Sequence, residues 1–345
     1  MAITRIGNPA IADQRGVNFR NIIINGDMSI AQRGTSSSNV STGYHTCDRW
    51  RIFRGAGTIT MSQETDAPTG LGFVKSVKFL EAGSGSSPSA GDRNFLQHRI
   101  EGQNLQYLKK GTSSAEQLTL SFHVKSTVTG TYIAELFDND NSRQVSKAYT
   151  ISSANTWEYK TITFPADTSG TLDNDNGSSL QLNLYFTAGS NYTSGTLNTT
   201  WNSNTDANRA VGQVNVVASA NGAIQWTGIQ LEAGQVASDF EFLPYDVNEN
   251  RCQRYFQEVG GSVTGSVGFG NSFTGVYNNT TEIIAGRILP VKMRAAPTVT
   301  FSALSTFDLE PYDTAPSSLS AQNTSPDEVN LNADNTSSRK KGFEG

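Results

Sequence analysis

The feature that most limits the fold of this chain is a set of short segments in which apolar and polar residues alternate. In residues 117–127, QLTLSFHVKST, every second side chain is apolar, which predicts a strand with one buried face and one polar face that carries His123. Strand-like composition recurs in residues 131–137, 157–164, 180–186, 211–217 and 224–231. Because Gly, Asn, Asp and Ser clusters separate these segments, we expect an all-β protein built as a two-sheet jelly-roll sandwich.

Residues 21–35, NIIINGDMSIAQRGT, have a second distinctive pattern. The β-branched run Ile22–Ile24 is typical of a strand, and Asn25, Gly26 and Asp27 form a turn signal in which Gly26 would take a positive φ. The alternation that follows predicts a second strand. This stretch therefore favours a strand, a tight turn and a strand.

Composition excludes several classes of function. The net charge of −5 and the pI near 5.3 give no broad basic surface for nucleic acid. We find no stretch with the length and hydropathy of a membrane span, and residues 1–16 lack the apolar core of a secretory signal. Cys47 and Cys252 lie far apart without a CxxC partner, so we expect two buried thiols rather than a zinc site or a disulfide.

The composition also changes along the chain, and we expect four regions. Residues 1–20 form an extended arm, residues 21–248 the jelly-roll sandwich, residues 249–312 a short helical connector with a small β module, and residues 313–345 a polar tail. The helix is expected in residues 251–257. The arm is either an anchoring segment for assembly or an unstructured leader, and its charged residues are Arg5, Asp13, Arg15 and Arg20.

Several blocks of sequence carry a resemblance to a known group of proteins. They are NIIINGDM at 21–28 with AQRGTS at 31–36, DRW at 48–50, QLEAG at 230–234, FE at 240–241 with PY at 244–245, and CQRYF at 252–256. In content and order these blocks resemble those of bacteriophage appendage proteins, the short tail-fibre and virion-surface proteins. The NGDM start is also similar to the NGDF start of jelly-roll carbohydrate-binding modules. The resemblance implies a virion protein, made in the cytoplasm of a host bacterium and assembled as a homotrimer with other virion proteins.

The chain lacks the usual catalytic motifs, among them GxSxG, HExxH and the P-loop. We therefore expect no enzyme activity and no cofactor, with a structural calcium ion as the exception to be tested. Asp173 and Asp175 lie at alternate positions of an oxygen-rich stretch, which suits either calcium or plain turn chemistry. The jelly-roll resemblance implies a separate calcium site, with Asp27 and Glu232 as its side chains.

Recognition of a glycan needs flat aromatic surface beside polar side chains. Trp201, Tyr192 and Tyr44 lie in polar segments and are candidate ligand-binding residues, although each could equally pack against a neighbouring subunit. The other tryptophans, which lie in or beside predicted strands, are expected in the core: Trp50, Trp157 and Trp226.

The leading hypothesis is a non-enzymatic virion protein, a trimeric tail fibre that binds a glycan on the host surface. A capsid decoration or head-fibre protein, held by its N-terminal arm, is the first alternative. A free carbohydrate-binding protein or a glycan-cleaving enzyme is the second.

Overall fold

A computed structural model describes residues 19–258, 273–277, 282–301 and 316–334 of the chain. The chain divides into two units, Met1–Asn248 and Glu249–Gly345. Most of the predicted arm, including Arg5, Asp13 and Arg15, lies outside the described residues. Within these residues the α-helices are short: α1 (Ser190–Thr193) and α2 (Tyr245–Gln253).

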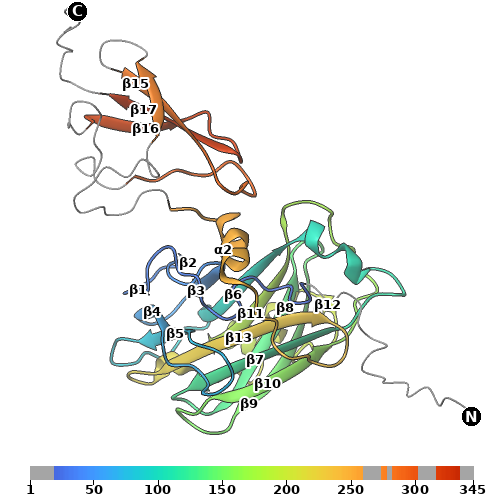
Figure 1. The fold of residues 1–345 in the computed structure, drawn as a ribbon. Helices are drawn as coiled ribbons and strands as arrows, with labels where there is room; N and C mark the ends of the chain where they lie inside the picture. Colours follow the sequence, from blue (N-terminus) through green and yellow to red (C-terminus); the bar gives the residue numbers. More distant parts are fainter. Residues whose placement is uncertain (1–18, 259–272, 278–281, 302–315, 335–345) are drawn as a thin grey trace, which may run out of the picture. The chain divides into compact units, whose positions relative to one another are not determined.

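The first unit contains two antiparallel sheets (Figure 1). The six-stranded sheet has the order β1 (Ser36–Ser37), β4 (Ile59–Glu64), β5 (Ser76–Glu81), β13 (Ala223–Ala233), β7 (Leu118–Ser126) and β10 (Glu158–Phe164). The seven-stranded sheet has the order β12 (Asn202–Ser203), β9 (Arg143–Ile151), β8 (Gly130–Asp138), β11 (Ser178–Ala188), β6 (Arg93–Glu101), β3 (Trp50–Arg54) and β2 (Gly43–Tyr44). Short 3-10 turns occur at Gly102–Asn104, Gln106–Leu108, Asp206–Asn208 and Val216–Ala218.

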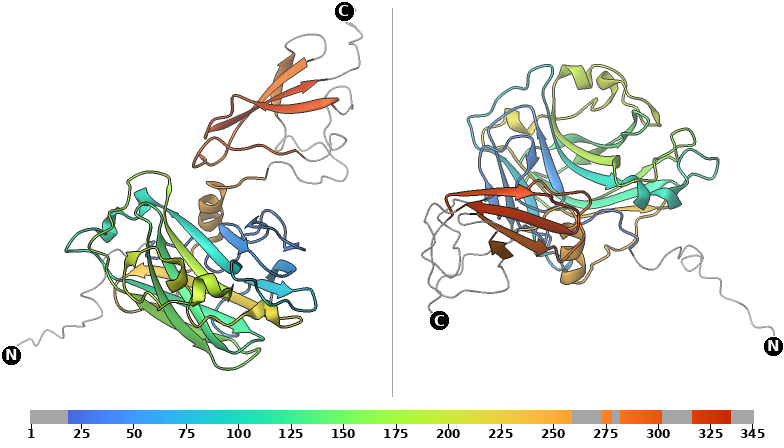
Figure 2. Two further views of the ribbon diagram at one scale, coloured as in Figure 1. Left: turned by 180° about the vertical axis from the view of Figure 1, so that it is seen from behind. Right: turned by 90° about the horizontal axis from the view of Figure 1, so that it is seen from above.

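Strands that are distant in sequence are neighbours in both sheets, as a jelly roll requires. β13 lies between β5 and β7, and β11 lies between β6 and β8. The two layers are visible in both views of Figure 2. The predicted all-β jelly-roll sandwich is thus confirmed.

The core lies between the sheets and is filled by the inward side of each strand. Its largest fully buried side chains include Trp50, Trp226, Phe79, Phe122 and Phe186. Each such side chain contributes roughly 1.5–3 kcal/mol through burial, so this layer is the main source of stability. Cys47 and Cys252 are buried thiols and are not joined in a disulfide, as expected.

Three expectations for the first unit are wrong. Residues 211–217 form no strand: they run through a turn into a 3-10 turn, where Val216 and Val217 are both buried. His123 is buried because the rings of Phe73 and Tyr159 pack against its ring, with centroids at 5.2 and 4.9 Å. Trp157 is only half-buried, since its ring nitrogen donates to the exposed Asp66 (3.1 Å).

The second unit contains a small antiparallel sheet with the order β14 (Thr274–Tyr277), β15 (Glu282–Ile288), β17 (Glu328–Asp334) and β16 (Ser318–Gln322). The prediction of a coreless polar tail over 313–345 is wrong for residues 316–334, which supply two of these strands. Val329 and Leu331 alternate along β17 and pack with Leu289, so few apolar residues suffice for this sheet. The predicted helix at 251–257 is shifted, since α2 ends at Gln253.

Candidate glycan-binding face

The outer face of the seven-stranded sheet, which points away from the core, carries an unusual line of polar side chains. Strand register places six residues side by side across it, one from each of six strands, and we call them the outer row: Tyr44, Arg51, Gln97, Asn183, Glu135 and Ser146. The alternation of each strand explains the placement. Trp50, Ile52 and Leu96 point into the core, so their neighbours Arg51 and Gln97 point outward.

Gln97 is the centre of the outer row. Its carboxamide oxygen accepts from Arg51 Nη1 (3.0 Å) and Arg99 Nε (2.8 Å). Its carboxamide nitrogen donates to Gln181 Oε1 and Asn183 Oδ1, both at 2.9 Å. A carboxamide offers two donors and two lone pairs, so every hydrogen-bonding position of Gln97 is used. Gln97 therefore fixes the orientation of four polar side chains across β3, β6 and β11.

The same network continues to a buried ion pair at Glu135. Arg209 donates from Nε and Nη2 to the two carboxylate oxygens, each at 2.8 Å. Asn183 (2.8 Å) and Tyr185 (3.2 Å) donate to the same carboxylate. Burial, the negative charge of Glu135 and the hydrogen bond to it raise the pKa of the Tyr185 hydroxyl. Arg209 thus neutralises Glu135. The part of the outer row around Glu135 therefore stabilises the sheet.

Aromatic side chains flank the outer row. Phe53 and Phe95 stack with ring centroids 4.9 Å apart, and Tyr185 packs on Phe95. The Arg93 guanidinium lies over Phe53 at 4.8 Å and over Tyr192 at 4.5 Å. Tyr44 sits at the β2 end, directly across from Arg51. Flat hydrophobic rings therefore lie beside the amide and guanidinium groups.

Residues 189–215 cover one part of this face. Ala210, Tyr192 and Leu197 pack on Phe95 and Ile133 to form a second, small hydrophobic cluster outside the sheet. Other outward side chains of the same face are only half-buried: Tyr44, Arg51, Phe53, Arg99, Phe137 and Gln181. The face therefore combines a rigid, covered base with a half-exposed set of aromatic, amide and guanidinium groups.

The structure separates the three predicted ligand-binding aromatics. Tyr44 lies in the outer row, and Tyr192 lies against Arg93 near it. Trp201 precedes β12 at the opposite edge of the sheet from Tyr44, where its Nε1 donates to the Pro165 carbonyl (2.8 Å) and its ring covers Lys110 at 4.6 Å. Trp201 also packs against the main core, so it and Tyr44 do not share one site.

Arg51, Gln97 and Asn183 cannot be recognised as site residues from the sequence. Nothing in the local pattern marks them, since single polar residues on the outer side of a strand are common. These residues become neighbours through strand pairing, which brings together positions as far apart as Arg51 and Asn183, 132 residues along the chain. Alternation within one strand does not reveal which strands pair.

The carboxylates predicted for calcium are engaged in separate places. Asp27 accepts from Ser29 Oγ (3.1 Å) and Asn248 Nδ2 (3.2 Å), whereas Glu232 accepts from Ser238 Oγ (2.7 Å). Asp173 and Asp175 lie in an exposed turn, where Asp175 accepts from the Gly177 amide (2.7 Å). In the described part of the chain, no group of three or more His, Cys, Asp or Glu side chains is placed to hold a metal ion.

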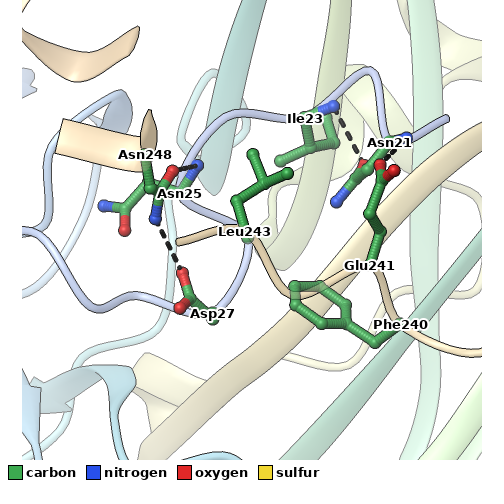
Figure 3. Close-up of a pocket in the computed structure, with 9 residues that line it drawn as sticks. Asn21, Ile23, Asn25, Asp27, Phe240, Glu241, Leu243 and Asn248 are labelled. Atoms are coloured by element: carbon green, nitrogen blue, oxygen red, sulfur yellow. Dashed lines mark hydrogen bonds between the residues drawn. The ribbon is translucent and has the colours of Figure 1, made fainter. Parts of the chain in front are cut away.

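The NIIINGD stretch lines a small pocket and forms no strand, so the predicted strand–turn–strand is wrong (Figure 3). Positive φ occurs at Asn25 (59°) and Met28 (61°) rather than at Gly26. Gly26 is needed for another reason: a Cβ there would lie 2.1 Å from the Ile229 carbonyl oxygen of β13. Close backbone approach, not turn geometry, accounts for this glycine.

Asparagine side chains replace strand pairing in this stretch. Asn21 donates to the Ile229 carbonyl (3.1 Å) and accepts from the Leu231 amide (3.1 Å). Asn25 donates to the Ile30 and Asp48 carbonyls, both at 2.9 Å. Buried backbone groups are thereby satisfied without a ladder.

The pocket also marks where the N-terminal segment joins the unit. Glu241 accepts from the amides of Phe19 (2.8 Å) and Asn21 (2.9 Å), and Arg20 donates to the Asp239 carbonyl (3.4 Å). In Figure 3, Glu241 lies next to Asn21 and Asn248 lies between Asn25 and Asp27. These contacts are local and structural, so we place the candidate site on the outer row instead.

Comparisons with known proteins add the following. No protein-family model matches the chain, and no curated protein sequence matches it. The enzymatically active domain of tailspike protein 4 of bacteriophage CBA120 is 15% identical over 63% of this chain and 22% of that chain, with a TM-score of 0.35. This chain therefore spans about a fifth of that protein's length. The tripod of the bacteriophage Tuc2009 baseplate is 14% identical over 64% of this chain and 57% of that chain (TM-score 0.27).

A third similar structure is a family 11 carbohydrate-binding module from Clostridium thermocellum, solved in complex with a β-1,3-1,4-mixed-linked tetrasaccharide. It is 12% identical over 59% of this chain and 98% of that chain, with a TM-score of 0.31. Among the described residues, no helix has the length and apolar character needed to cross a membrane.

Proposed function

We propose that the chain is a bacteriophage virion appendage protein whose jelly-roll sandwich binds a glycan of the host surface, without enzymatic activity. The observation that carries the proposal is the outer row, where Gln97 orders amide and guanidinium groups beside half-exposed aromatic rings. The resemblance of the NIIINGDM, QLEAG and CQRYF blocks to phage appendage proteins supports the virion role.

The outer row has the chemistry that sugars require. Sugar hydroxyls both donate and accept hydrogen bonds, and Gln181 and Arg51 present such groups at the half-exposed surface. The less polar face of a sugar ring packs on an aromatic ring, for which Tyr44 and Phe53 are available. Because the Gln97 network fixes these groups before binding, little side-chain entropy is lost on binding.

The test compares two tyrosines on opposite sides of the sandwich. Tyr44→Ala removes a ring from the outer row, and Tyr159→Ala removes an exposed tyrosine from β10 of the other sheet. On an array of bacterial surface polysaccharides we expect Tyr44→Ala to weaken binding about 2- to 10-fold, the value of one aromatic contact. Equal losses for both variants, or an unchanged Tyr44→Ala, would contradict the proposal. Unchanged circular-dichroism melting curves would exclude unfolding as the cause.

The position on the particle is tested separately. A trimeric tail fibre and a head decoration differ in where the chain sits, so virions imaged with an antibody to residues 249–345 decide between them. We expect label at the tail tip. Label spread over the head would favour the decoration role and an arm that grips the capsid.

A further inference from the structure

Arg51 of the outer row and Arg99 beside it share a single neutral acceptor. Arg51 on β3 and Arg99 on β6 both donate to the carboxamide oxygen of Gln97. Each guanidinium has five N–H groups, and within the described part of the chain only one from each is hydrogen-bonded. The remaining donors belong to side chains that are half-exposed to solvent.

Neither arginine forms an ion pair with a carboxylate among the described residues. This differs from Arg33, Arg143 and Arg209, which pair with Asp48, Asp167 and Glu135 at 2.8–3.2 Å. Burial, and then the positive charge of Arg99, lower the pKa of Arg51. Two like charges are therefore held together on a partly desolvated surface.

A third guanidinium extends the same positive region. Arg93 lies between the rings of Phe53 and Tyr192, and its Nε and Nη1 are buried with no hydrogen-bond partner in the described part of the chain. The nearest carboxylate of the outer row, Glu135, is already paired with Arg209. The half of the face made by β3 and β6 thus carries positive charge while the whole chain carries −5.

We infer that the glycan bound by the outer row is acidic, and that Arg51 and Arg99 bind its carboxylate, sulfate or phosphate oxygens. This inference rests on the proposed glycan-binding function. An oxyanion would supply the counter-charge that the arginines lack, and the planar fork of arginine matches oxyanion geometry. The aromatic rings of Tyr44 and Phe53 would contact the sugar ring at the same time.

The overall charge makes nonspecific adsorption a poor alternative. A chain of net charge −5 and pI near 5.3 repels polyanions at neutral pH, so their binding requires a local positive site. Binding through that site should weaken as salt screens the charges, because the Debye length falls from about 10 Å at 0.1 M to about 3 Å at 1 M.

The experiment uses the full chain and matched polymers that differ in their acidic groups. The pairs are alginate and carboxyl-reduced alginate, dextran sulfate and dextran, and phosphomannan and mannan, each titrated by calorimetry. Arg51→Gln and Arg99→Gln remove one arginine each, while Lys78→Gln removes one positive charge from β5 on the other sheet, where its neighbours Val77 and Phe79 are buried. Melting curves confirm that each variant is folded. If one arginine variant does not fold, the other still tests the inference.

We expect binding to the acidic member of at least one pair, and the pair identifies the acidic group. Arg51→Gln and Arg99→Gln should each weaken that binding roughly 10- to 100-fold, as loss of a charged hydrogen bond does, and Lys78→Gln should not. Binding to none of the acidic polymers, or equal binding to both members of each pair, overturns the inference. If the chain binds a neutral polymer and Tyr44→Ala weakens that binding, the proposed glycan-binding function stands. Only the inference of an acidic ligand is then refuted.

Discussion

Replacing Glu135 with glutamine should destabilise the sandwich strongly. The Glu135 carboxylate is fully buried and accepts hydrogen bonds from Arg209, Asn183 and Tyr185. Glu135→Gln keeps the size of the side chain and an acceptor for Asn183, but it leaves the buried Arg209 charge with only the exposed Asp206 carboxylate, 3.4 Å from Nη1, as a counter-ion. Breaking a buried ion pair by removing one partner costs about 3–5 kcal/mol. For a unit of this size that corresponds to a drop in melting temperature of roughly 10 °C.

A second substitution and a surface control make the test specific. Arg209→Met in the Glu135→Gln background removes the buried charge that has lost its main partner, so the double variant should be more stable than Glu135→Gln alone. Glu116→Gln breaks the exposed pair with Lys109 and should cost less than about 1 kcal/mol. Urea and thermal unfolding followed by circular dichroism measure all three. The reasoning fails if Glu135→Gln is no worse than Glu116→Gln, or if Arg209→Met destabilises it further.

Two further predictions concern buried titratable groups. Burial lowers the pKa of His123 below its value in the unfolded chain, so the unfolded state binds the extra proton first and stability should fall as pH drops below about 6.5. In the His123→Phe variant the new ring can pack between Phe73 and Tyr159. Urea titrations should show that this variant loses less stability between pH 7.5 and pH 5 than the parent protein. An identical loss in both proteins would contradict the prediction. Burial raises the pKa of Cys47 to about 12, so it should react with a disulfide reagent at pH 8 only after unfolding; mass spectrometry showing rapid labelling of Cys47 in the folded chain would argue against this.

The sequence predicts the strands well where alternation is local. Residues 117–127 and 224–231 correspond to β7 and β13, because an alternating apolar face needs a sheet to bury it. Prediction fails where burial depends on distant segments. His123 has the pattern of a surface residue, yet the rings of Phe73 and Tyr159 pack on it from other segments of the chain. Nothing in the sequence predicts β16 and β17, because the few apolar residues of β17 gain burial only when it pairs with β15, and β16 forms only as the edge strand beside β17.

The candidate site was less accessible to sequence reasoning than the fold. Only Tyr44 of the predicted aromatics lies in the outer row, and it was chosen for its polar surroundings rather than its partners. The chemistry of the site depends on which residues are cross-strand neighbours, and that depends on register. Arg51, Gln97 and Asn183 come from β3, β6 and β11, so their meeting is a tertiary property.

Four of the blocks that carry the resemblance meet in space: NIIINGDM, DRW, QLEAG and FE. Asn21 of the NIIINGD stretch is hydrogen-bonded to Ile229, which precedes the QLEAG block, and to Leu231 within it. The ring nitrogen of Trp50 in the DRW block donates to the Asn25 carbonyl (2.8 Å). Glu241 of FE completes the group by accepting from the Asn21 amide. The amide side chains have few substitutes there because they satisfy buried backbone groups, and Gly26 has few because a Cβ would lie 2.1 Å from the Ile229 carbonyl oxygen. The shared role of these residues is therefore to hold residues 21–25 against β13 and β3, which closes this seam of the sandwich.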